Sequence, residues 1–134
     1  MRSYITFEVE SFIRDYPSNL RALEGLRDRL AELTEIPGVD LTRDRVQTSP
    51  RNALEEQAIT RAYLLDEIHA YESYFRRFEY AYNNITAEQR TIIDAYKDGG
   101  RYVIDRLCYE LGLEKSRVYE LRREAFDSFA KFAI

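Results

Sequence analysis

The chain has 134 residues and a formal net charge of -4, which suits one domain or a small domain with a helical extension. Its hydrophobic content of 45% and charged content of 33% exclude the composition of a disordered chain. The single cysteine, Cys108, excludes an internal disulfide and a paired-cysteine metal site, and it favours a reducing, cytoplasmic setting.

The N-terminal region, residues 1–36, has the pattern of two helices. Its opening, MRSYITFEVESF, contains acidic side chains and no continuous apolar core, so we expect no signal peptide. Pro17 ends the first helix and fits the first turn of the second. The two apolar stripes are Ile5, Val9, Phe12, Ile13 and Tyr16, and then Leu20, Leu23, Leu26, Leu30 and Leu33. The leucine spacing resembles a short heptad seam, which predicts a hairpin or a coiled-coil-like pair.

Residues 37–51 are polar, contain two prolines and show no period, so we interpret them as a linker. A long helix is predicted over 52–84, with Ser49 as its cap and Pro50 in its first turn. Its apolar stripe is Leu54, Ala58, Ala62, Leu65, Ile68, Tyr71, Phe75, Phe78 and Tyr82. The mean step of about 3.5 residues indicates packing along a partner helix. That partner is either the leucine-lined helix or a second copy of the chain.

Three shorter helices are predicted over residues 85–134. Thr86 and Gln89 form a capping box at the first, Gly99-Gly100 ends it, and Gly112 ends the second. The apolar faces are Ile92, Ile93 and Tyr96, then Val103, Ile104, Leu107, Cys108 and Leu111, then Val118, Leu121, Ala125 and Phe129. A glycine turn between the last two helices predicts a helix-turn-helix domain, so the chain is expected to be all-α. No apolar run approaches the roughly 20 residues that span a bilayer, and we expect no membrane partner.

The last helix has the pattern of a DNA-recognition helix. If Val118, Leu121 and Ala125 are buried, the opposite side presents Ser116, Tyr119, Glu120, Arg123 and Asp127. Lys115, Arg117 and Arg122 flank that side. Between residues 115 and 123 the net charge is +3, close to a helix N-terminus that favours phosphate. The alternative is an ordinary amphipathic helix, whose outer face is also charged.

Whole-chain charge does not decide between these interpretations. Residues 86–134 carry nine basic and nine acidic side chains, whereas residues 1–85 carry eleven and fifteen. The acidic excess therefore lies in the N-terminal part, and affinity for DNA depends on the cations at the contact face. Modest intrinsic affinity is expected, helped by dimerisation or a partner.

Residues 85–132 resemble the helix-turn-helix that ends bacterial sigma factors, and more closely the ArpU/RinA-type phage transcriptional regulators. The motif T-x-E-x-R-x-I-I-x-x-Y is matched by Thr86, Glu88, Arg90, Ile92, Ile93 and Tyr96. An aromatic residue before the second helix, Tyr102, and a closing Y-x-L-R-x-x-A are matched as well, the latter by Tyr119, Leu121, Arg122 and Ala125. Upstream, DRVQTSPRNALEEQAI at 44–59 is similar to the linker and long helix of the same group.

The resemblance implies a phage or prophage protein that activates late genes in the cytoplasm of a bacterial host. Carried over by position, Lys115, Ser116, Arg117, Tyr119 and Glu120 face the major groove, and Arg122 and Arg123 contact phosphates. The family usually caps this helix with Ser or Thr where the chain has Glu114, and a later helix start would shift the contacts by a turn.

The expected partner is double-stranded promoter or operator DNA, bound by a homodimer or small homo-oligomer. The acidic N-terminal region is expected to serve oligomerisation or contact with RNA polymerase. No cofactor, metal or catalytic residue is predicted, because the single histidine, His69, leaves no Ser-His-Asp or Cys-His set to assemble, and Cys108 lies on an apolar helical face.

Two other classes of function stay open. A small packaging subunit that recognises viral DNA would form large rings with ATPase partners, so its mass in solution would exceed that of an activator. A helical structural or adaptor protein would bind no DNA at low salt.

Overall fold

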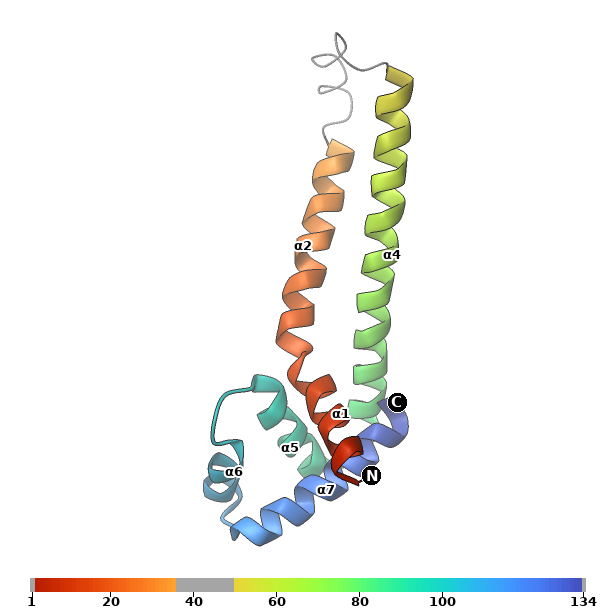
Figure 1. Ribbon diagram of the computed structural model, residues 1–134. Helices are drawn as coiled ribbons and strands as arrows, with labels where there is room; N and C mark the ends of the chain where they lie inside the picture. The colour runs from red at the N-terminus through yellow and green to blue at the C-terminus, as the bar shows by residue number, and fades with distance from the viewer. Residues whose placement is uncertain (1, 36–49, 134) are drawn as a thin grey trace. The chain divides into compact units, whose positions relative to one another are not determined.

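Six helices make up the part of the chain that the computed structural model describes, residues 2–35 and 50–133 (Figure 1). In chain order they are α1 (Arg2–Arg14), α2 (Tyr16–Glu35), α4 (Pro50–Asn83), α5 (Ala87–Asp98), α6 (Val103–Leu111) and α7 (Lys115–Ala133). No strand occurs in these two ranges, so the all-α prediction is confirmed. The expected linker falls mainly on 36–49, outside the described residues, as does the expected cap Ser49; Pro50 already belongs to α4.

The chain divides into two compact units. The first joins Met1–Asn19 to Tyr74–Ile134, and the second is Leu20–Ser73. The sequence interpretation groups residues 1–36 together, whereas the contacts separate them after Asn19. The reason is that the apolar face of α1 packs with α5 and α7. None of the helices in the described ranges combines the length and apolar character needed to cross a membrane.

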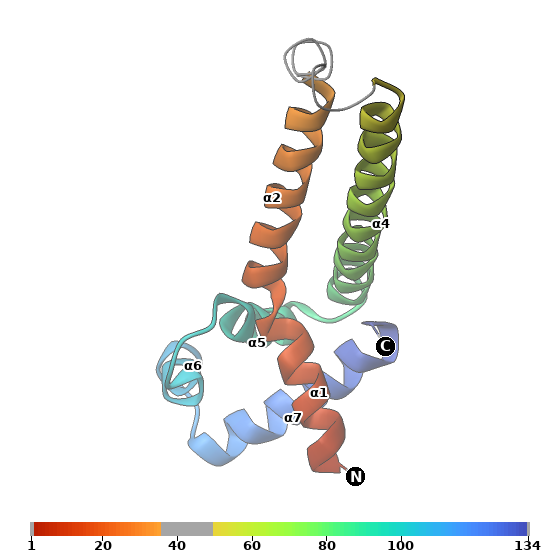
Figure 2. The ribbon, with the colours of Figure 1, turned by 45° about the horizontal axis from the view of Figure 1, so that its top comes forward.

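A continuous apolar core fills the first unit. α7 lies against α1, α5 and α6, as Figures 1 and 2 show. Phe126 and Phe129 of α7 are fully buried: the ring of Phe126 lies 5.1 Å from that of Tyr96, and the ring of Phe129 lies 5.1 Å from that of Phe78. The C-terminal aromatic residues of α7 therefore close the core against the end of the long helix.

α1 contributes a second layer to this core. Val9 and Ile13 are buried, and the ring of Phe12 lies 6.0 Å from that of Phe129. The backbone carbonyl of Phe12 accepts a hydrogen bond from the hydroxyl of Tyr74 on α4. Burial is the main cause that raises the pKa of this Tyr74 hydroxyl far above its usual value. α1 is thus an integral part of the unit that contains α7.

The helix ends within this unit follow local chemistry. At the start of α5, the amide of Gln89 donates to Oγ1 of Thr86 at 3.2 Å, and the amide of Thr86 donates to Oε1 of Gln89 at 3.0 Å. At its end, Gly99 adopts a φ of 77° and its amide donates to the carbonyl of Tyr96. The predicted capping box and glycine stop are both confirmed.

In the second unit, α2 lies beside α4, as both ribbon views show. Leu23 of α2 and Leu64 and Ile68 of α4 are buried. Nη2 of Arg27 lies 3.1 Å from Oε2 of Glu72, which ties the two helices together. Pairing of the long helix with the leucine-lined helix and pairing with a second copy of the chain both stay predictions.

The predicted stripe on α4 is wrong in its first turns. Leu54 is 54% exposed, and Ala58 and Ala62 are exposed as well, whereas Leu64 is 1% exposed. A repeat of 3.5 residues drifts by about 20° per heptad on a straight α-helix. The predicted stripe therefore rotates away from the side of α4 that is buried, and at this point of the helix Leu64 is buried in place of the predicted Leu65.

Replacing Phe129 tests the shared core of the first unit. We expect Phe129→Ala to lower the free energy of unfolding by about 3–5 kcal/mol, because it removes a fully buried ring from between α1 and α4. Denaturant unfolding followed by circular dichroism measures the change. Tyr109→Ala is the control, since that ring is 91% exposed and its removal should leave stability nearly unchanged. If both variants lower the free energy of unfolding by a similarly small amount, the packing described for Phe129 is contradicted.

Candidate nucleic-acid interface

A tight turn joins α6 to α7. Gly112 follows the last residue of α6 in the left-handed region, with φ 66° and ψ 35°. The amides of Gly112 and Leu113 both donate to the carbonyl of Cys108, at 2.9 and 3.2 Å. Only residues 112–114 separate the two helices. A glycine at this position lets the chain reverse without the steric cost of a side chain, and the turn fixes where α7 begins.

The inner side of α7 is held by the core. Val118, Leu121 and Ala125 are buried, as the sequence pattern predicts. They belong to one apolar cluster with residues of α5 and α6, including Ile92 and Leu107. This burial fixes the rotation of α7 about its own axis and therefore decides which side chains face outward.

Six of the seven predicted contact residues lie on the outer side of α7. All six are exposed: Lys115, Ser116, Arg117, Tyr119, Glu120 and Arg123. The helix starts at Lys115, and the carbonyl of Glu114 accepts from the amide of Val118 at 3.0 Å. Glu114 therefore occupies the cap position that the sequence assigns to it, and the later start considered above does not occur.

The cations near the start of α7 have acidic neighbours. Nζ of Lys115 lies 3.6 Å from Oδ1 of Asp105 on α6, and Nη1 of Arg117 lies 2.9 Å from Oε2 of Glu120. All four side chains are more than half exposed. Ion pairs in such positions contribute little to stability and exchange readily with solvent or ligand. Arg123 has no hydrogen bond or ion pair with any residue that the structure describes.

Arg122 differs from the other six residues. Its side chain is 21% exposed, and Nη2 lies 3.2 Å from Oε1 of Glu10 on α1. Its guanidinium carbon stands 5.5 Å from the ring centre of Tyr96 and 5.2 Å from that of Phe126. Arg122 therefore connects α7 to α1 and the core, and it is not part of the exposed face of α7.

Glu10 completes this connection. Its second oxygen, Oε2, accepts from Nε of Arg14 at 3.3 Å, and the Arg14 guanidinium lies 5.1 Å from the ring of Tyr96. One carboxylate thus neutralises two arginines that cover the same aromatic ring. Burial raises the pKa of the Tyr96 hydroxyl, while the nearby charge of Arg122 acts in the opposite direction.

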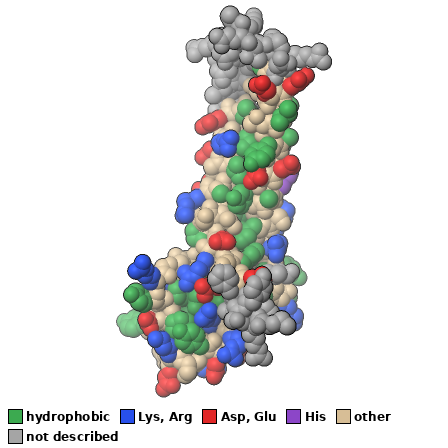
Figure 3. All heavy atoms as spheres, viewed as in Figure 1, with side chains coloured by type: hydrophobic (Ala, Val, Ile, Leu, Met, Phe, Trp, Pro, Cys, Tyr) green, Lys and Arg blue, Asp and Glu red, His purple; other side chains and the backbone are tan. Residues whose placement is uncertain are grey.

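Two tyrosines at α6 are exposed. Tyr102, which the motif comparison places before the second helix, is 74% exposed and precedes the first residue of α6 in the left-handed region, with φ 62°. Tyr109 on α6 is 91% exposed and was missed by the sequence interpretation, although it lies off the predicted apolar face. Figure 3 shows Lys and Arg interspersed with Asp and Glu over the region of α5, α6 and α7, around an apolar area. The candidate surface is mixed in charge.

The remaining residues that could carry chemistry are not among the exposed residues of α7. His69 is exposed on α4 in the second unit, and Cys108 is half-buried against the apolar core. Across residues 2–35 and 50–133, no three His, Cys, Asp or Glu side chains come together in a way that could hold a metal ion.

No family model matches the chain, and neither the curated proteins nor the solved structures contain a match to it. The likeness to phage regulators therefore rests on the motifs themselves.

The neighbouring arginines of α7 allow a matched test. We expect Arg122→Ala to lower the free energy of unfolding by about 1–2 kcal/mol, because it removes a half-buried ion pair and the packing of its stem. Arg123→Ala should leave stability nearly unchanged, since this side chain is exposed. Denaturant unfolding of both variants gives the comparison. Equal stabilities would show that the contact between Arg122 and Glu10 does not hold α1 on α7.

Proposed function

We propose that the chain is a sequence-specific DNA-binding transcriptional regulator, an activator of phage or prophage late genes. One observation carries the proposal: α7 begins after a three-residue glycine turn, buries its apolar side, and exposes short polar and basic side chains in its first turns. This is the arrangement that a recognition helix needs. The motifs shared with the phage regulators support the assignment to late genes.

In the proposed complex, the first two turns of α7 lie in the major groove. Ser116, Tyr119 and Glu120 face the base edges, where hydroxyl and carboxylate groups distinguish one base pair from another. Lys115, Arg117 and Arg123 flank them and contact phosphates or bases. α1 packs on the other side of α7, through Glu10 and Phe12, so it leaves this face uncovered.

The proposed complex depends on more than one copy of the chain. A single mixed-charge helix offers few cations to the backbone, so each copy alone should bind DNA weakly. A homodimer or small homo-oligomer would place two such helices in successive major grooves, one helical turn apart. The operator is then expected to contain two related half-sites.

Footprinting on the DNA that flanks the chain's own gene tests the proposal. Protection of a short, repeated sequence, weakening steeply as salt rises, is the expected result. Absence of any protected site at low salt, together with no shift of random duplex DNA, would exclude the function.

A charge-reversal pair tests the surface itself. We expect Lys115→Glu combined with Arg123→Glu to abolish operator binding, or to weaken it by about 100-fold or more at low salt, because two cations become anions beside the phosphates. Gel shift or fluorescence anisotropy measures the affinity, and circular dichroism checks the fold.

The control is Arg21→Glu combined with Arg29→Glu on α2. Both arginines are exposed, and the whole-chain charge changes by the same amount. If the control pair weakens binding as much as the α7 pair does, the effect comes from total charge and the proposed face is wrong.

A further inference from the structure

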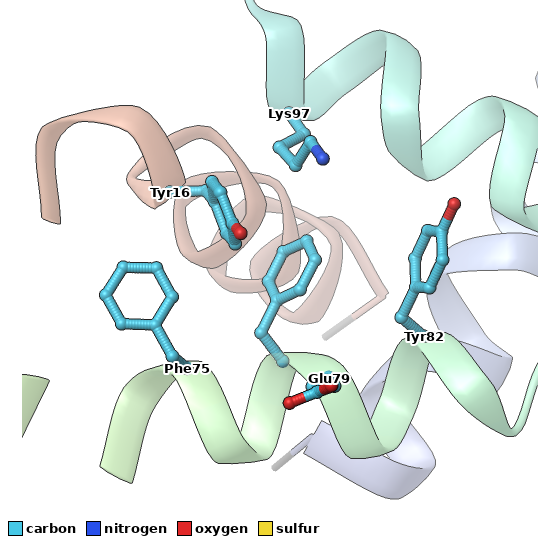
Figure 4. A pocket seen from close by; sticks show the side chains of 6 residues that line it. Tyr16, Phe75, Glu79, Tyr82 and Lys97 are labelled. Carbon is cyan, nitrogen blue, oxygen red and sulfur yellow. The ribbon is translucent and has the colours of Figure 1, made fainter. Parts of the chain in front are cut away.

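A pocket on the first unit has walls made of aromatic rings. It has a volume of about 320 Å³ and is lined by Tyr16, Phe75, Phe78, Glu79, Tyr82 and Lys97. Figure 4 shows Phe75, Glu79 and Tyr82 side by side along α4, with Tyr16 of α2 and Lys97 of α5 facing them. The volume lies at the small end of the range for ligand-binding pockets. The candidate nucleic-acid surface on α7 uses none of these residues.

The rings form a connected wall. The centroid of Tyr16 lies 5.0 Å from that of Phe75, with the planes at 86°, and 4.8 Å from that of Phe78. Phe78 in turn stacks on Tyr82 at 6.4 Å. Positions 75, 78, 79 and 82 fall on one face of a helix, which brings the Glu79 carboxylate into the same wall. Tyr16, Phe75 and Tyr82 are only partly buried, so these three rings leave aromatic surface open to the cavity.

The electrostatics of this wall favour a cation. Ring faces carry partial negative charge, and Nζ of Lys97 already lies 4.9 Å from the centre of the Tyr16 ring. The guanidinium of Arg90 lies 5.5 Å from the Tyr82 ring. Lys97 is neutralised in part by Asp94, whose Oδ1 is 3.9 Å from its Nζ. Glu79 is exposed at the mouth of this wall and has no hydrogen bond or ion pair with any described residue, so its carboxylate is open to a ligand cation.

We propose that this pocket binds a small organic cation, a quaternary ammonium or guanidinium head on a short apolar body. The head lies against Phe75, Phe78 and Tyr82 and pairs with Glu79. Lys97 covers the Tyr16 wall when the pocket is empty and is displaced toward Asp94 when the cation enters. The site does not depend on the DNA-binding proposal, because it uses different residues and a different ligand.

The chemistry resembles that of aromatic cages for quaternary ammonium groups, in which the attraction is electrostatic rather than only hydrophobic. A neutral molecule of the same shape therefore fills the cavity but loses most of the attraction. A half-open cavity of this size should hold its ligand weakly, with a dissociation constant on the order of millimolar.

The first experiment compares two probes on the unaltered chain. Choline chloride and its neutral isostere 3,3-dimethyl-1-butanol are titrated at constant ionic strength, and the aromatic proton shifts of the pocket tyrosines are followed by NMR. We expect choline to bind about tenfold or more tightly than the isostere. Equal affinities, or no shift with choline at concentrations where millimolar binding would saturate, would overturn the proposal.

The second experiment uses two variants that should change the affinity for choline in opposite directions. Glu79→Gln should weaken choline binding by about three- to tenfold, because it removes the only carboxylate among the lining residues. Lys97→Met should strengthen binding by a similar factor, because it removes the competing cation. Glu124→Gln on α7, which is exposed and does not line the pocket, is the matched control and should change nothing.

The sign of the Lys97→Met effect separates a cation site from an anion site. Weaker choline binding in this variant, or weaker binding in Glu124→Gln equal to that in Glu79→Gln, contradicts the proposal. Circular dichroism establishes that each variant is folded, and the isostere comparison needs no variant at all.

Discussion

The burial of one side of α7 is the constraint on which the rest of the first unit depends. Val118, Leu121, Ala125, Phe126 and Phe129 are all buried along this helix, and they meet residues of α1, α5, α6 and the end of α4. Burial of large apolar side chains supplies most of the stability of such a unit. Because α7 contacts each of these helices, a rotation of α7 about its own axis would disturb the packing of the whole core. The outward direction of Ser116, Tyr119 and Arg123 follows from that packing and not from any contact that these residues make themselves.

Two adjacent arginines show how this constraint divides packed from exposed side chains. Arg122 and Arg123 differ by 100° around the helix, which places one beside α1 and the other in solvent. Arg122 shares the carboxylate of Glu10 with Arg14, and both arginines cover the ring of Tyr96. This cluster lets α1 pack on α7 without leaving a half-buried charge unpaired, which would be costly. α1 therefore belongs to the same unit as α7, although it lies at the other end of the chain.

The features that could be predicted from the sequence are those that local chemistry decides. The ends of α5 depend on Thr86, Gln89 and Gly99, which interact within a few residues, and the end of α6 depends on Gly112. The buried side of α7 follows from its period. The role of Arg122 could not be predicted, because its partner Glu10 is 112 residues away and only the folded chain brings them together. The same holds for the aromatic pocket, whose walls come from α2, α4 and α5. The prediction of which α4 residues are buried was wrong in the first turns for a simpler reason. A small error in the assumed helical period accumulates over a long helix.

The acidic neighbours on the outer side of α7 are consistent with the proposed reading of base sequence. Asp105 and Glu120 lie within 3.6 Å of Lys115 and Arg117, so they reduce the positive field that any duplex would meet. Attraction to the phosphate backbone is independent of sequence, and weakening it lowers affinity for the large excess of wrong sites. Because these pairs are more than half exposed, a correctly placed base or phosphate can replace the carboxylate at small cost. An incorrect site offers no such replacement and meets the carboxylates instead. Under the proposed function, mixed charge on this face would therefore favour discrimination between sites over tight binding by a single copy.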